Sequence, residues 1–271
     1  MSVQTEQPRT TIRRLQEMRK ARSPIVCLTA YDAGFARLLD EAAVDVILVG
    51  DSLGMVVQGH DTTVPVTLDH MIYHTSMAAR GCERALLMAD MPFMSYTGPA
   101  QALANAARLM QEGGAQMVKL EGDGGQVEVV SALARHGIPV CAHLGLRPQS
   151  IHKLGGYRVQ GRGVHAGERM MRDAVTLQDA GADMLLLECV PSVLAAEIRG
   201  IVDIPVIGIG AGADCDGQIL VLHDVLGMTG RPPRFAADFL AETGDIRAAL
   251  AAYVSAVRER RFPGPEHSFQ D

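Results

Sequence analysis

The chain has 271 residues, of which 48% are hydrophobic and 21% are charged, so it is long enough to bury a large core. Its formal net charge of −6 gives no electrostatic reason to expect nucleic acid or an anionic membrane as a partner. The N-terminal segment lacks the apolar centre of a secretory signal, and no apolar stretch approaches the about 20 residues that span a bilayer. We therefore expect a cytoplasmic protein with no nucleic-acid or membrane partner.

A short helix is expected before the first strand. Ile12, Leu15 and Met18 recur at helical spacing and share one face. We expect residues of about 8–22 to form a helical cap at the closed end of the fold that follows.

Eight short apolar runs then recur along the chain, and helical patterns separate most of them. The runs are residues 25–30, 44–50, 85–90, 115–122, 138–145, 182–189, 204–212 and 218–224. Continuous apolar runs are typical of strands that are buried on both faces of a parallel sheet. Eight of them predict a single (β/α)₈ barrel domain over residues 1–271. An open doubly wound sheet is the alternative, and the connection between the last two runs is short for a full helix.

Carboxylic acids follow three consecutive strands of this predicted barrel, at the ends where barrel enzymes carry their catalytic groups. They are Asp51, Asp90 and Glu121, after the second, third and fourth runs. Neighbouring strands lie about 4.8 Å apart, so these carboxylates can converge on one point. Clustered carboxylates repel one another unless a cation lies between them, and all-oxygen ligands favour Mg²⁺ over zinc. The alternative is that each acid caps the helix after its strand.

The residues GDSL at 50–53 spell a signature of a class of serine esterases. A serine hydrolase needs a histidine that accepts the hydroxyl proton and an acid that orients the histidine. In those esterases the pair forms Asp-x-x-His near the C-terminus, but no histidine of this chain has an aspartate three residues before it. We therefore expect Ser52 to bind substrate and not to act as a nucleophile.

Two motifs resemble cofactor sites. Residues 208–213 fit the dinucleotide fingerprint, but Asp-Cys-Asp-Gly follows in place of a helix, so we interpret them as a glycine loop that approaches a ligand closely. His70 and His74 have a spacing that can hold zinc on a helix. No third ligand is evident beside them, so we favour two surface histidines.

A long glycine-rich and basic segment, residues 143–163, follows the fifth run. Long loops in compact domains are usually functional. Its glycines would let it fold over a bound anion, with charge from Lys153, Arg158 or Arg162. The alternative is an exposed loop without a role in binding.

Taken together and in this order, these motifs resemble the ketopantoate (3-methyl-2-oxobutanoate) hydroxymethyltransferase family. The similarity runs from about Thr29 to Phe269. Its motifs include VGDSLGMVVQGHDTTVPVT, ADMPFMSY, MVKLEG, HLGLRPQS, LGGYRVQGR, LECVP, IPVIGIGAG, DGQILVLHD and PGPEHSF. Arg147 departs from the pattern, where a small polar residue is expected, and we expect it to affect substrate handling alone.

The resemblance implies a (β/α)₈ barrel of the phosphoenolpyruvate/pyruvate-like superfamily that binds Mg²⁺ and assembles as a homodecamer. It implies transfer of a hydroxymethyl group from 5,10-methylenetetrahydrofolate to 3-methyl-2-oxobutanoate through a Mg²⁺-stabilised enolate. The product would be 2-dehydropantoate (ketopantoate), for pantothenate and coenzyme A biosynthesis. The metal ligands that it implies are Asp51, Asp90 and, through water, Glu121. The substrate contacts that it implies are Asp51, Ser52, Asp90 and Lys119, and the catalytic base is Glu188.

This assignment agrees with the chemistry, because the substrate must lose a proton from the carbon beside its ketone. Glu188 follows the sixth strand, across the barrel mouth from the acids, so it is expected to reach that carbon without ligating the metal. Burial there would raise its pKa and make it a stronger base. One alternative is a Mg²⁺-dependent C–C lyase of the isocitrate lyase type, although the Lys-Lys-Cys-Gly-His loop of those lyases does not occur here. The other is a non-catalytic ligand-binding barrel.

Overall fold

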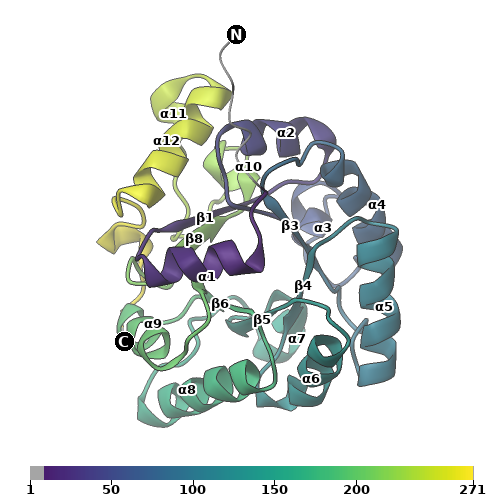
Figure 1. The fold of residues 1–271 in the computed structure, drawn as a ribbon. Helices are drawn as coiled ribbons and strands as arrows, with labels where there is room; N and C mark the ends of the chain where they lie inside the picture. The colour runs from purple at the N-terminus through teal and green to yellow at the C-terminus, as the bar shows by residue number, and fades with distance from the viewer. Residues whose placement is uncertain (1–8, 271) are drawn as a thin grey trace.

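The structure is a computed structural model and describes residues 9–270. Its eight strands are all parallel and close into one barrel in sequence order (Figure 1). The strands are β1 (Ile25–Thr29), β2 (Val46–Val49), β3 (Leu86–Asp90), β4 (Met117–Glu121), β5 (Val140–Gly145), β6 (Met184–Glu188), β7 (Val206–Ile209) and β8 (Gly217–Leu220). Because β8 pairs with β1, the predicted (β/α)₈ barrel is confirmed and the open sheet is excluded.

Seven longer helices form the layer outside the barrel (Figure 1). They are α2 (Ala33–Glu41), α4 (Leu68–Ala79), α5 (Pro99–Gln111), α6 (Val127–Arg135), α8 (Val164–Asp179), α9 (Ser192–Ile201) and α12 (Ile246–Arg258). Shorter helices in the connections are α3 (Leu53–Val56), η1 (Gly124–Gln126), η2 (Pro148–Ser150), α7 (Ile151–Leu154), α10 (Leu222–Val225), α11 (Leu240–Thr243) and η3 (Pro265–His267). The connection from β7 to β8, which lies wholly within the described residues, contains no helix. None of the helices within 9–270 is long and apolar enough to cross a bilayer.

The strands read as continuous apolar runs because both of their faces are covered. All residues of β1, β2 and β3 are buried between the barrel interior and the surrounding helices. The helices instead bury one side. In α2, for example, Ala36 and Leu39 face the barrel, and the Asp32 side chain caps the first turn by accepting a hydrogen bond from the Phe35 amide. Each large aliphatic side chain so buried contributes roughly 1.5–3 kcal/mol, which makes this two-layer core the main source of stability.

The seam at which β8 meets β1 is covered from outside by α12. The Tyr253 hydroxyl group of this helix lies 2.7 Å from the backbone oxygen of Cys27 in β1. It also lies 3.3 Å from the backbone oxygen of Gln218 in β8. One buried side chain therefore joins the first and last strands of the barrel.

Helix α1 (Ile12–Lys20) lies across the N-terminal end of the barrel, where it appears in purple in Figure 1. Leu15 and Met18 are buried beneath it. Arg19 pairs with Asp216 at 3.0 Å and donates to the backbone oxygen of Ile204 at 3.1 Å, just before β8 and β7 respectively. The cap expected over about 8–22 starts at a residue outside the described part of the chain, and its helix occupies 12–20.

Candidate active site

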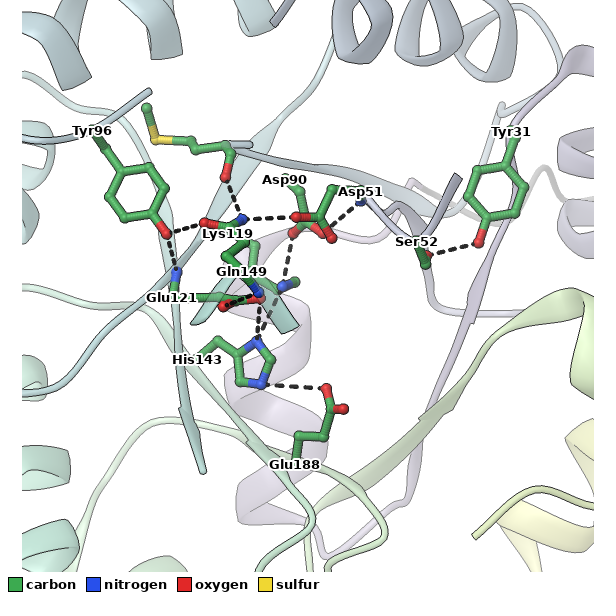
Figure 2. A network of polar contacts seen from close by, with 11 residues as sticks. Tyr31, Asp51, Ser52, Asp90, Tyr96, Lys119, Glu121, His143, Gln149 and Glu188 are labelled. Carbon is green, nitrogen blue, oxygen red and sulfur yellow. Dashed lines mark hydrogen bonds and ion pairs between the residues drawn. The ribbon is translucent and has the colours of Figure 1, made fainter. Parts of the chain in front are cut away.

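All six side chains predicted for the site line one cavity of about 420 Å³ at the C-terminal ends of the strands. They are Asp51, Ser52, Asp90, Lys119, Glu121 and Glu188. Figure 2 shows the side chains and their polar contacts. They meet because a closed parallel barrel directs every strand end to the same mouth.

Asp90 and Lys119 form the ion pair at the centre of the site. The register of β3 and β4 places the two residues side by side, and Lys119 Nζ lies 2.8 Å from Asp90 Oδ1. Asp90 Oδ2 accepts a hydrogen bond from the Asp51 amide at 2.9 Å. Burial lowers the pKa of Lys119, but the charges of Asp90 and Glu121 outweigh it and raise the pKa above its usual value. Lys119 is therefore a fixed buried cation.

Negative charge exceeds positive charge around this pair. Burial, and next the charge of Asp90, raise the pKa of Asp51 to about 7. Burial and the charge of Asp51 raise the pKa of Glu121 well above its usual range. His143 does not compensate, because burial and the charge of Lys119 hold its pKa well below the usual value and leave it neutral. A bound cation would relieve this imbalance.

Gln149, at the start of the segment after β5, is a site residue that sequence reasoning missed. Its side-chain amide donates to Asp51 Oδ2 at 2.8 Å and to the backbone oxygen of Met91 at 2.9 Å. Its backbone N–H donates to Glu121 Oε2 at 3.1 Å. The Tyr96 hydroxyl group donates to its side-chain oxygen, as Figure 2 shows. Gln149 therefore sets the positions of two of the predicted metal-binding carboxylates.

We expect Gln149→Leu to lower the free energy of unfolding by about 1–3 kcal/mol, because it leaves buried acceptors without a donor. Urea unfolding followed by circular dichroism measures the change. The matched control is Gln101→Leu, since Gln101 forms its side-chain hydrogen bonds at the exposed start of α5. An equal loss of stability in both variants would contradict the role given to Gln149.

The residues fit Mg²⁺ in donor type and charge, although they do not form a preformed ligand set. Within the described range 9–270, no three His, Cys, Asp or Glu side chains are grouped closely enough to hold a metal ion. Asp51 and Glu121 instead accept hydrogen bonds from Gln149. Asp90 Oδ1 is buried beside Lys119 Nζ, and hard carboxylate oxygens with excess negative charge suit a hard divalent cation.

Glu188 lies on the other side of His143 from this cluster (Figure 2). His143 Nδ1 lies 3.2 Å from Lys119 Nζ, and its Nε2 lies 3.4 Å from Glu188 Oε2. Burial raises the pKa of Glu188 to about 8, despite the opposing charge of Lys119. The geometry thus separates a basic carboxylate from the acid cluster by a neutral imidazole.

The backbone around Glu188 requires glycine on the neighbouring strand. Gly145, at the end of β5, has φ +95° and pairs with Glu188 at the end of β6. A Cβ atom on Gly145 would lie 2.2 Å from the backbone oxygen of Glu188. Cys189, the residue after Glu188, adopts φ +48°, which is uncommon for a residue other than glycine. Glu188 is therefore held by a backbone contact that a larger residue would displace.

Ser52 immediately precedes α3 and has the surroundings of a ligand-binding hydroxyl group. Its Oγ lies 2.9 Å from the hydroxyl group of Tyr31. Burial raises the pKa of Tyr31, which therefore stays protonated and acts as a hydrogen-bond partner. None of the hydrogen bonds formed by Ser52 Oγ within residues 9–270 involves a histidine. This agrees with the expectation that Ser52 is not the nucleophile of a triad.

The segment 143–163 contributes to the cavity differently from what its basic residues led us to expect. It contains η2 and α7, and its cavity-lining side chains beyond His143 are Leu146, Pro148 and Tyr157. Lys153, Arg158 and Arg162 do not line the cavity in this conformation, so the expectation that one of them supplies charge to a bound anion stays a prediction. Arg147 does not line the cavity either, and it pairs with Asp123 at 3.1 Å.

The two motifs that resemble cofactor sites have structural roles. A Cβ atom on Gly210 would meet Phe235 and Phe269 at 3.0 Å, and one on Gly212 would meet Ser192 at 2.6 Å. The glycines of the loop therefore lie close to other parts of this chain, and the interpretation of the loop as a ligand contact stays a prediction. His70 accepts a hydrogen bond that caps α4, and His74 lies 2.8 Å from the backbone oxygen of Tyr31. Neither histidine belongs to a metal-binding group of the described residues.

The sequence also matches a known family. The sequence model described as ketopantoate hydroxymethyltransferase matches residues 9–265. The chain belongs to the ketopantoate hydroxymethyltransferase family. This confirms both the predicted family and the predicted enzyme class, a hydroxymethyltransferase.

Individual relatives agree with the family. Two proteins named 3-methyl-2-oxobutanoate hydroxymethyltransferase, from Halorhodospira halophila and Alkalilimnicola ehrlichii, are each 62% identical to this chain. The first alignment covers 96% of this chain and 94% of the relative. The second alignment covers 98% of this chain and 96% of the relative. The similarity to this hydroxymethyltransferase family therefore extends over almost the whole chain.

A solved structure shares the fold of this chain. The crystal structure of 2,3-dimethylmalate lyase, named as a member of the PEP mutase/isocitrate lyase superfamily, has a TM-score of 0.56 to this chain. The comparison covers 82% of this chain and 89% of the lyase, with 18% sequence identity. This similarity supports the barrel fold alone. At that identity it carries no argument for the alternative lyase activity.

Proposed function

We propose that this protein transfers a hydroxymethyl group from 5,10-methylenetetrahydrofolate to 3-methyl-2-oxobutanoate and so forms ketopantoate for pantothenate biosynthesis. The observation that carries the proposal is the placement of Glu188. It is a carboxylate of raised pKa that faces the same cavity as the acid cluster and is separated from it by a neutral histidine. The printed names of the 62% identical relatives support 3-methyl-2-oxobutanoate as the acceptor.

The acid cluster and Lys119 would bind the 2-oxo acid together with Mg²⁺. Asp51 and Asp90 would hold the ion directly, and Glu121 would complete its surroundings through water. Bound Mg²⁺ supplies Lewis-acid polarisation of the substrate's ketone, which acidifies the neighbouring C–H bond. Lys119 would offset the substrate's carboxylate charge, and Ser52 would donate a hydrogen bond.

Glu188 would then accept the proton from C3 of the substrate. The electrons of the broken C–H bond enter the bond between C2 and C3, and C3 becomes a nucleophile. The methylene carbon of the folate is bonded to two nitrogens, and attack by C3 forms the new C–C bond and breaks one of these C–N bonds. A water molecule then displaces the second nitrogen, and its oxygen becomes the new hydroxyl group. Tetrahydrofolate leaves with both nitrogens as amines, which carry the proton removed from C3 and one proton of the water.

Incubation of the purified protein with 3-methyl-2-oxobutanoate, methylenetetrahydrofolate and Mg²⁺ tests the proposal. We expect ketopantoate to accumulate, as measured by mass spectrometry, and to be absent when either organic substrate is omitted. Failure to form ketopantoate under these conditions, with a correctly folded protein, would refute the proposed function.

Ser52→Ala should reduce activity only moderately. The variant loses one hydrogen bond to substrate, about 0.5–3 kcal/mol, which corresponds to at most a few hundredfold in kcat/KM. Removal of a triad nucleophile would cost on the order of 10⁶ in kcat. Steady-state kinetics measures the effect, with Tyr31→Phe as the partner variant. Covalent labelling of Ser52 by a fluorophosphonate, with loss of all turnover, would instead support the esterase mechanism.

The family resemblance also leads us to propose a homodecamer. The chain mass of 29.0 kDa makes this assembly easy to recognise. Light scattering coupled to size exclusion should give about ten times that mass, and a monomeric or dimeric mass would refute it.

A further inference from the structure

The cavity extends from the acid cluster to the ends of β7 and β8, into a part that the enolisation step does not use. Its walls there are the apolar side chains of Ile209, Leu220, Val221, Pro233 and Phe235. The polar side chains of this part are Asp224, Thr229 and Arg231, from α10 and the segment after it. We define these eight residues as the β8 subsite.

Asp224 is the unusual residue of the β8 subsite, because it is a buried carboxylate without a cation. Its side chain lines the cavity, although the residue is only 6% exposed. Its Oδ1 accepts a hydrogen bond from Thr229 Oγ1 at 2.6 Å. In the described part of the chain it forms no ion pair within 4 Å, even with Arg231 of the same subsite. A buried carboxylate with one hydrogen bond retains acceptor capacity that a ligand can satisfy.

The β8 subsite adjoins the proposed binding site of the 2-oxo acid. The His223 ring, next to Asp224 in the chain, packs against Tyr31 with 5.6 Å between ring centroids. The Tyr31 hydroxyl group in turn contacts Ser52, at the edge of the acid cluster (Figure 2). Ser52 and Asp224 also line the same cavity, so a ligand in the β8 subsite would share that cavity with a substrate bound at Ser52.

We propose that Asp224 binds the pteridine ring of the folate co-substrate, an inference that rests on the proposed function. The 2-amino-4-oxopyrimidine edge of that ring presents a ring N–H and an amino N–H side by side. Two parallel N–H groups match the two oxygens of one carboxylate, as in other bidentate pairs. The flat ring would pack against Phe235 and the aliphatic walls, and the Thr229 hydroxyl group orients the carboxylate. The cavity volume lies within the range of about 300–1,000 Å³ that is usual for small-molecule sites.

The test compares two readouts in Asp224→Asn, which keeps the shape but puts an amide donor against the donors of the ring. We expect its KM for methylenetetrahydrofolate to rise about 10- to 100-fold, from the loss of a charged hydrogen bond. Exchange of the C3 hydrogen of 3-methyl-2-oxobutanoate in D₂O needs no folate and should stay at the wild-type rate. Asp203→Asn is the matched control, since Asp203 is exposed at the opposite end of the barrel and should change neither readout.

A wild-type KM for the folate in Asp224→Asn would overturn the inference. A fall in the exchange rate by the same factor as the rise in that KM would also overturn it. If Asp224→Asn does not fold, Thr229→Val replaces it and should raise the same KM by a smaller factor, again with normal exchange. Calorimetric titration of tetrahydrofolate into wild type and variant separates this inference from the proposed function. Equal affinities would refute the role of Asp224, whereas the absence of ketopantoate from the wild-type assay refutes the function itself.

Discussion

Glu188→Gln should bind Mg²⁺ and 3-methyl-2-oxobutanoate almost as the wild type does, yet lose the exchange of the substrate's C3 hydrogen in D₂O. The amide keeps the shape of the carboxylate but cannot accept the proton, while Asp51, Asp90 and Lys119 remain in place. General-base catalysis contributes about 10²–10⁴-fold, so the exchange rate should fall by at least that range. Proton NMR of the substrate measures the exchange, and calorimetry measures the binding.

The pH dependence of the same exchange identifies the base. Burial raises the pKa of Glu188 to about 8 in the metal-free protein, and the base is its deprotonated form. The rate should therefore rise with pH and level off above the pKa, which the positive charge of Mg²⁺ shifts below 8. Wild-type exchange in Glu188→Gln would exclude this residue as the base. His143, whose Nε2 lies 3.4 Å from Glu188, would then be the next residue to change.

Removal of Mg²⁺ by EDTA should abolish ketopantoate formation, and added Mg²⁺ should restore it. A bound metal contributes several kcal/mol to such a reaction, on the order of 10³-fold or more. Asp90→Ala should weaken the binding of both the ion and the 2-oxo acid, as calorimetry measures. Because that change also leaves Lys119 buried without its partner, Asp90→Asn serves as the variant of matched shape. Full turnover in metal-free buffer would contradict the proposed metal site.

The affinity for Mg²⁺ should also depend on pH. Burial and the charge of Asp90 raise the pKa of Asp51 to about 7, and only the deprotonated carboxylate binds the ion. Affinity should therefore increase as pH rises through about 7. Because folding raises the pKa of Asp51, the metal-free protein loses stability as the pH rises from about 4 to about 7. Bound Mg²⁺ should offset this loss. Melting temperatures with and without Mg²⁺ measure this, and a pH-independent difference would refute it.

Local sequence was sufficient for the eight strands and for the polar residues at their ends, whereas the pairing of β8 with β1 decided between the barrel and the open sheet. A strand covered on both faces must be apolar throughout, so continuous runs such as 25–30 identified the strands without any knowledge of their partners. Once eight such strands close in parallel, every residue at a strand end faces one mouth. Asp90 and Glu188 were therefore predictable from their positions alone, since each is the last residue of its strand.

Only the tertiary structure decided what lies between these residues. Gln149 and Tyr96 sit on segments after β5 and β3, and their contacts with Asp51 and Glu121 depend on the path of each segment through space. The same dependence explains why Tyr157 lines the cavity whereas Lys153, Arg158 and Arg162 do not. The ends of strands are positioned by the repeating backbone hydrogen bonds between neighbouring strands, and sequence periodicity reveals those strands. A loop side chain is positioned by contacts with residues distant in sequence, which no local pattern encodes.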